Sequence, residues 1–289
     1  MKTGWKLLLI YTFFVIVWGA FVRASGSGDG CGAHWPSCHG GYILESSSTK
    51  TLIEYTHRAT SGLYGIFVLL LSIMTMFSAR FSRTAKIFAF GVLTFTILES
   101  LVGAKLVLSE LVGSNASHAR ALVMIIHLSN TLLLVACNTG VIFFDDKKTK
   151  FTDLTHLKKW GPVLLLFLIT GASGALAALG DTLYPSESLL KGFSMDFDPQ
   201  SPWLIKVRSF HPFFAFALTA SVIWITDPKR RFGLSLIGLG LSTLIVGLIN
   251  LALLAPLPLQ LGHLTIAMSF WVICLMYFFD LSTGKKLQS

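Results

Sequence analysis

Residues 233–254 read GLSLIGLGLSTLIVGLINLALL, a stretch of 22 residues without a charged side chain. Because about 20 apolar residues in a helix cross the roughly 30 Å hydrocarbon core of a bilayer, this stretch predicts a transmembrane helix. Seven further apolar runs lie at residues 5–23, 52–78, 87–108, 120–144, 161–179, 205–226 and 260–280. None alternates between polar and apolar residues, as the strands of a membrane barrel would. The sequence therefore predicts an all-α integral membrane protein with eight transmembrane helices.

The composition excludes several classes of protein. Of the 289 residues, 53% are hydrophobic and 13% are charged. A soluble domain carries about 25% charged residues, so a water-soluble enzyme is excluded. Intrinsic disorder requires low hydrophobicity and high charge, and is excluded as well. Four cysteines are too few for a disulfide-dense scaffold.

The distribution of the basic residues predicts the orientation. Fifteen of the 23 Lys and Arg residues lie near the two termini or in the loops near 79–86, 145–160 and 227–232. By the positive-inside rule these segments are cytoplasmic, and the long loops 24–51 and 180–204 face outward from the cell's inner (plasma) membrane. An alternative for the first run is a signal peptide, since Lys2 and Lys6 precede or begin it.

Four of the eight histidines fall in alternate predicted helices, the second, fourth, sixth and eighth: His57, His127, His211 and His263. Each lies three to seven residues from the outer end of its run, a depth of roughly 5–10 Å at 1.5 Å per residue. The placement is the same in the first and last four helices, as in a parallel repeat. We therefore predict two four-helix halves, residues 1–150 and 151–289, with the four imidazoles at one level near the outer face.

Ionisable side chains inside a membrane are candidates for function. Two imidazoles on facing helices suit the two axial positions of one haem iron, so two such pairs predict two haem sites. Zinc would require three or four ligands close together. Two alternatives stay open: histidines that only hydrogen-bond neighbouring helices, and a transporter or proton channel built on buried histidines.

The segments around these histidines carry specific motifs. They are the run Gly19–Gly28, the Cys31-x6-Cys38 loop that encloses Trp35-Pro36, Glu54-x-x-His57-Arg58, Arg208-x-x-His211-Pro212, the stretch from Asn250 to Pro258, and Gly262–Ala267. This combination closely resembles the haem A synthase family, and the resemblance extends from the first predicted helix to the eighth.

The resemblance implies oxidation of a methyl group of haem O, through successive hydroxylations, to the formyl group of haem A. It implies that His211 and His263 ligate a resident haem b in the second half, and that His57 and His127 form the site of the substrate haem O in the first. Glu54 is implied as the acidic catalytic residue beside that site. The i,i+3 spacing puts Glu54 and His57 on one helix face; alternatively, Glu54 is a first-turn acid favoured by the helix dipole.

Four further residues carry expectations, namely Arg208, Cys31, Cys38 and Glu99. Arg208 either binds a haem propionate or extends along the helix to the membrane interface. Cys31 and Cys38 are expected to form a disulfide in the outer loop, with a structural or a redox-active role. Glu99 stands where the family leads us to expect glutamine, and its spacing from Lys105 predicts no ion pair between them.

The resemblance also implies partners. These are haem O synthase, the assembly of cytochrome oxidase, an unidentified electron donor and membrane lipid, and a homo-oligomer is compatible with it. No nucleic-acid partner is expected. The alternative function is a bis-histidine dihaem membrane cytochrome that transfers electrons without changing the haem.

Overall fold

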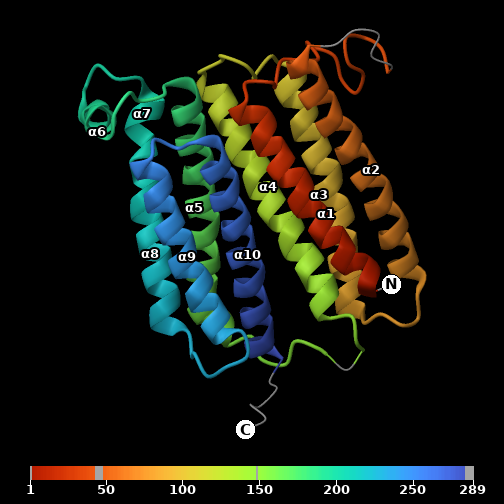
Figure 1. The fold of residues 1–289 in the computed structure, drawn as a ribbon. Coiled ribbons are helices and arrows are strands. Elements are labelled where there is room, and N and C mark those ends of the chain that lie inside the picture. The colour runs from red at the N-terminus through yellow and green to blue at the C-terminus, as the bar shows by residue number, and fades with distance from the viewer. Residues whose placement is uncertain (1, 43–47, 148, 284–289) are drawn as a thin grey trace.

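The computed structural model describes residues 2–42, 48–147 and 149–283, and all structural statements concern these residues. They form helices and connecting loops (Figure 1). The helices are α1 Lys2–Ala24, α2 Thr49–Phe77, α3 Arg83–Leu108, α4 His118–Phe143, α5 His156–Leu183, α6 Leu189–Phe197, α7 Trp203–Arg208, α8 Phe210–Ile225, α9 Gly233–Ala252 and α10 Leu257–Ser282.

The protein is an all-α multi-pass membrane protein. Among the described residues, seven helices are long and apolar enough to cross a bilayer, namely α1 to α5, α9 and α10. They lie side by side in one bundle, and α1 begins at the same end at which α10 finishes (Figure 1). Large apolar side chains such as Phe77 and Trp224 are exposed, as expected for a surface that contacts lipid.

The predicted sixth span, 205–226, differs from the structure in that it is divided between α7 and α8. Pro212 explains the break at Ser209. Proline has no N–H to donate to the carbonyl four residues earlier, which here belongs to Arg208. Pro212 instead lies in the first turn of α8, where an N–H would have no partner within the helix. With 16 residues, α8 is the longer part of this traverse, and α7 contributes 6 residues.

The fifth helix is longer than predicted. The apolar run 161–179 lies inside α5, which extends over charged residues at both ends, including Lys158 and Asp181. An apolar run read from hydropathy ends at such charged residues, whereas the hydrogen-bonded helix continues through them. The expected loop 180–204 accordingly contains the last turn of α5 and the short helix α6.

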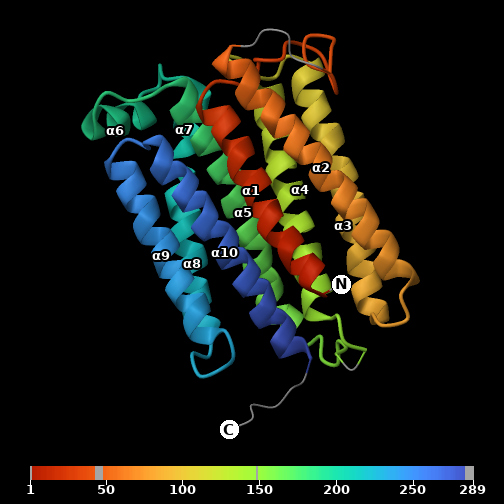
Figure 2. The same ribbon diagram turned by 45° about the vertical axis from the view of Figure 1, so that its right-hand side comes forward.

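Helices α1, α4, α5 and α10 pack against one another in the middle of the bundle. Helices α2 and α3 lie on one side of them, and α8 and α9 on the other (Figures 1 and 2). Aromatic side chains fill the centre: Trp5, Trp160 and Trp271 are buried, and Trp271 Nε1 donates to the Leu132 carbonyl at 2.9 Å. This packing joins α4 directly to α10.

Candidate functional site

His211 on α8 and His263 on α10 face each other across the bundle. Their ring centroids are 6.3 Å apart and their planes are 85° to each other. The Nδ1 atom of His211 lies 3.2 Å from both the Thr170 carbonyl and Ser173 Oγ on α5. An Nδ1–H that donates to this carbonyl leaves Nε2 unprotonated, which is the form of imidazole that binds a metal.

Glycines make room for three of the four helix histidines. A Cβ placed at Gly174 would lie 3.0 Å from His211 Cε1, and one at Gly247 would lie 2.9 Å from His263 Cε1. In the first half, a Cβ at Gly19 would lie 3.0 Å from His57 Cε1. Each imidazole therefore packs against the bare backbone of a neighbouring helix, and this contact restricts its orientation.

The spacing of the His211–His263 pair fits one metal ion between the rings. A metal–imidazole bond is about 2 Å long, so two nitrogens that bind from opposite sides are about 4 Å apart and the ring centres about 6 Å apart. The observed 6.3 Å meets this requirement. Perpendicular planes are compatible with it, because each ring can turn about its own bond to the metal.

His57 on α2 and His127 on α4 are the corresponding helix histidines of the first half. Both Nδ1 atoms are buried and have no hydrogen-bond partner among the described residues. The His127 Nδ1 atom lies 3.3 Å from Glu99 Oε1 on α3. Sequence reasoning left Glu99 without a partner, because this contact links two helices and appears in no local motif.

Glu54 on α2 is buried and lies at the base of the loop between α1 and α2. Its Oε2 accepts the backbone N–H of Cys31 at 2.8 Å. Its Oε1 accepts Arg58 Nε at 3.1 Å and forms an ion pair with the same guanidinium. Arg58 also donates to the carbonyls of His34 and Ser37, each at 2.6 Å. Glu54 is therefore held between its own helix and the loop.

Cys31 and Cys38 form the expected disulfide. Residues 31–38, called the disulfide loop below, are thereby closed into a ring whose first member contacts Glu54 and whose carbonyls contact Arg58. The loop therefore determines the position of the Glu54 carboxylate.

Arg208 is engaged by two carboxylates that sequence reasoning did not single out. Its Nε donates to Asp196 Oδ1 at 2.7 Å, and its Nη1 atom contacts Asp181 Oδ1 at 3.0 Å. Weaker contacts join it to Ser186 Oγ and the Gly192 carbonyl, at 3.3 and 3.2 Å. The guanidinium thus ties α7 to α5 and α6.

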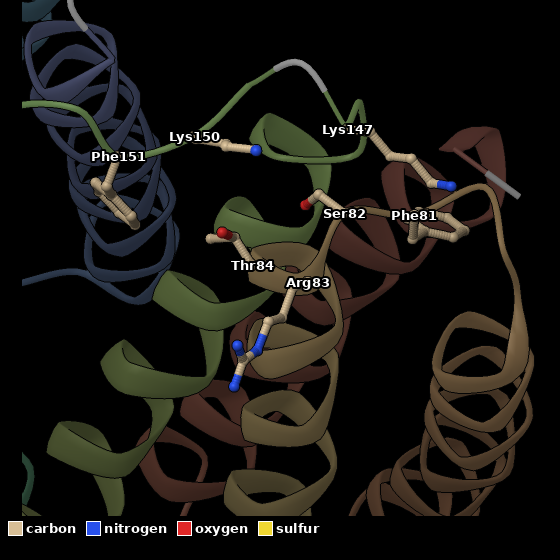
Figure 3. Close-up of a pocket in the computed structure, with 7 residues that line it drawn as sticks. All are labelled: Phe81, Ser82, Arg83, Thr84, Lys147, Lys150 and Phe151. Carbon is tan, nitrogen blue, oxygen red and sulfur yellow. The ribbon is translucent and has the colours of Figure 1, made fainter.

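A cavity of about 550 Å³ lies away from the histidines, at the end of the bundle where α1 begins. It is lined by Phe81, Ser82, Arg83, Thr84, Lys147, Lys150 and Phe151 (Figure 3). The Arg83 and Lys147 side chains extend in different directions there (Figure 3). The cations therefore do not converge on one point, as the polar groups of a ligand site would.

Comparison with known proteins identifies the family. A family model described as "COX15-CtaA: Cytochrome oxidase assembly protein" matches residues 5–275. The chain belongs to this family. The COX15-CtaA match begins in α1 and ends in α10, so it includes the disulfide loop and all four helix histidines.

The relatives compared below carry two different descriptions. A Thermus thermophilus protein described as protoheme IX farnesyltransferase is 36% identical over 297 residues, which is 94% of this chain and 48% of that protein. A heme A synthase of an Exiguobacterium species is 41% identical over 90 residues, 31% of this chain and 30% of that protein. A heme A synthase of Bacillus cereus is 33% identical over 166 residues, 55% of this chain and 51% of that protein. The matches thus cover about half of these relatives or less.

Proposed function

We propose that the chain is a haem A synthase, which oxidises a methyl group of haem O to a formyl group through successive hydroxylations and supplies haem A for cytochrome oxidase. The observation that carries the proposal is the His211–His263 pair, with ring centroids 6.3 Å apart, in a chain matched by the COX15-CtaA model over residues 5–275. The description of that family and the names of several relatives agree with it.

The proposal assigns a role to each half of the chain, residues 1–150 and 151–289. His211 and His263 hold a resident haem b in the second half, and His57 and His127 hold haem O in the first. The resident haem supplies electron transfer when it is bound. The spacing of the rings and the glycines beside them support the resident site. For the substrate site, the support is the two buried Nδ1 atoms and Gly19 beside His57.

Glu54 is the proposed catalytic acid of the first half. It lies three residues before His57 on α2, so the two side chains share a helix face. The carboxylate accepts hydrogen bonds from Cys31 and Arg58, which hold it in one position for proton transfer to or from the reacting group. Arg208 is proposed to act at the resident haem b, either by binding a propionate or by keeping α7 in place through its two aspartates.

The membrane orientation belongs to the same proposal. Both termini face the cytoplasm of a cell whose plasma membrane holds the protein, and the haem sites lie toward the outer face. The excess of Lys and Arg at the end where α1 begins supports this orientation. The proposed partners are haem O synthase, cytochrome oxidase assembly, an electron donor, membrane lipid and a second copy of the chain.

The test is reversed-phase chromatography of the haems extracted from membranes that contain the chain, in a host that makes haem O but no haem A. A peak of haem A or of its hydroxylated precursor supports the proposal. Haem b alone, in a chain that accepts electrons from a quinol, favours the dihaem cytochrome. If the chain farnesylates added protohaem, it has the activity for which the Thermus relative is named. A folded chain that binds no haem contradicts every haem assignment.

A further inference from the structure

Glu99 is a half-buried acid on α3 that the proposed function does not use. Its Oε1 lies 3.3 Å from His127 Nδ1. Asn130 Nδ2 and Thr131 Oγ1, three and four residues after His127 on α4, donate to its two carboxylate oxygens. Asn130 Nδ2 also donates to the Phe95 carbonyl at 2.8 Å. One face of α4 therefore fixes the Glu99 carboxylate beside the imidazole.

Glu99 has no lysine or arginine partner in the part of the chain that the structure describes. Lys105, the next charged residue along α3, is exposed. The His127 Nδ1 atom is buried, and no described residue makes a hydrogen bond to it in the present ring orientation. Glu99 Oε1 is an acceptor within reach, and a small rotation of the ring would align the N–H with it.

The second half offers a different environment. There His211 Nδ1 lies between a carbonyl and a hydroxyl oxygen, both uncharged. A neutral acceptor fixes which ring nitrogen carries the proton, whereas a carboxylate also makes the ligand more strongly donating to a metal. The two halves therefore differ in the group near Nδ1: a charged carboxylate at His127, and uncharged oxygens at His211.

We propose that Glu99 is a positioning residue for His127: its carboxylate accepts the Nδ1–H, keeps Nε2 unprotonated for the iron of the substrate haem, and strengthens His127 as a donor to that iron. The inference rests on the proposed function, because it takes His127 as a ligand. A more strongly donating ligand stabilises the oxidised iron, so the haem of the first half has a lower reduction potential than it would have with a neutral acceptor.

The first test is a redox titration, followed by absorbance, of the full chain loaded with haem in both halves. His127→Ala and His263→Ala assign the two transitions to their halves. Glu99→Gln removes the charge at nearly constant shape, and Lys105→Gln is the matched control because it removes a charge from the same helix. We expect Glu99→Gln to raise the midpoint potential of the first-half haem alone. The proposal is overturned if Glu99→Gln leaves the midpoint potential of the first-half haem unchanged or shifts the potentials of both haems equally. It is also overturned if Lys105→Gln causes the same shift as Glu99→Gln.

The second test needs no haem and decides the case in which Glu99→Gln loses the first-half haem. Nitrogen NMR of the full chain labelled at histidine and prepared without haem reports which ring nitrogen of His127 carries the proton. We expect Nδ1–H in the parent chain and a shift toward Nε2–H in Glu99→Ala; the same tautomer in both overturns the proposal. If the parent chain makes no haem A but the changes in potential and tautomer occur, the proposed function fails and the positioning role of Glu99 stands. If haem A forms without these responses, only the role of Glu99 fails.

Discussion

The Glu54 carboxylate accepts the backbone N–H of Cys31 at 2.8 Å, so a residue of α2 is held by the first residue of the disulfide loop. Arg58 contacts the same carboxylate and two carbonyls of the loop. The position of Glu54 therefore depends on Cys31, which lies 23 residues before it in the sequence. This relationship makes the disulfide loop part of the proposed catalytic site.

Glu54→Gln is expected to keep haem bound and to abolish haem A formation. Glutamine retains an oxygen that can accept from Cys31, but it cannot carry a proton to or from the reacting group. Loss of a general acid or base lowers a rate by about 10²–10⁴-fold. The measurement is haem content together with chromatography of the extracted haems. Glu187→Gln, a change of an exposed carboxylate, is the control, and a normal yield of haem A from Glu54→Gln contradicts the proton-transfer role.

The double variant Cys31→Ser/Cys38→Ser separates the two roles left open for the disulfide. If the bond is structural, its removal loosens the ring that holds Glu54, and product formation falls but persists. We expect this result, because closing so short a loop stabilises it by about 2 kcal/mol, a modest amount. Product formation is compared at equal haem content. Complete loss of product, with the haem still bound, would instead assign a redox role to the two thiols.

Gly247→Ala is expected to displace His263 and to lower the haem content of the second half. The added Cβ would lie 2.9 Å from the His263 Cε1 atom, closer than a carbon contact allows. Gly238→Ala is the matched control, because it adds the same methyl group to the same helix with no atom within 4 Å. Absorbance of the purified variants measures bound haem. Equal haem content in the two variants would show that the glycine contact does not orient the ligand.

Arg208→Ala is expected to destabilise the chain by about 3–5 kcal/mol, since it leaves two partly buried carboxylates without their cation. Asp196→Asn separates the two proposed roles of Arg208. If Arg208 keeps α7 in place, Asp196→Asn reproduces part of the loss of thermal stability and of haem. If Arg208 binds a propionate, Asp196→Asn leaves the haem content at the parental level. Thermal unfolding in detergent, with the haem absorbance recorded in parallel, measures both effects.

Sequence reasoning predicted the elements that depend on hydropathy. The all-α membrane architecture follows from apolar runs such as 233–254, and α9 ends within two residues of that run. The break at Ser209 was not predicted, although Pro212 carries the signal for it. The length of α5 was not predicted either, since its charged ends extend past the apolar run.

The site was predicted only as far as local motifs allow. The Cys31–Cys38 disulfide is confirmed, and it could be predicted because both cysteines lie in the same outer loop of the sequence. The partners of Arg208 and the contact between Glu99 and His127 could not be predicted, because they join residues on different helices. The roles of His57, His127, His211 and His263 as ligands stay predictions.

Arg23 near the end of α1 has a consequence for motion within the bundle. Its guanidinium donates to the Ala178 carbonyl at 2.7 Å and to Thr182 Oγ1, both on α5, and to Gln260 Oε1 on α10 at 3.1 Å. Separating α1 from α5 and α10 at this level would break all three hydrogen bonds together, each worth about 1.5–3 kcal/mol for a charged donor. We therefore expect this boundary to stay closed, and we expect a bulky ligand to enter and leave the bundle by another route.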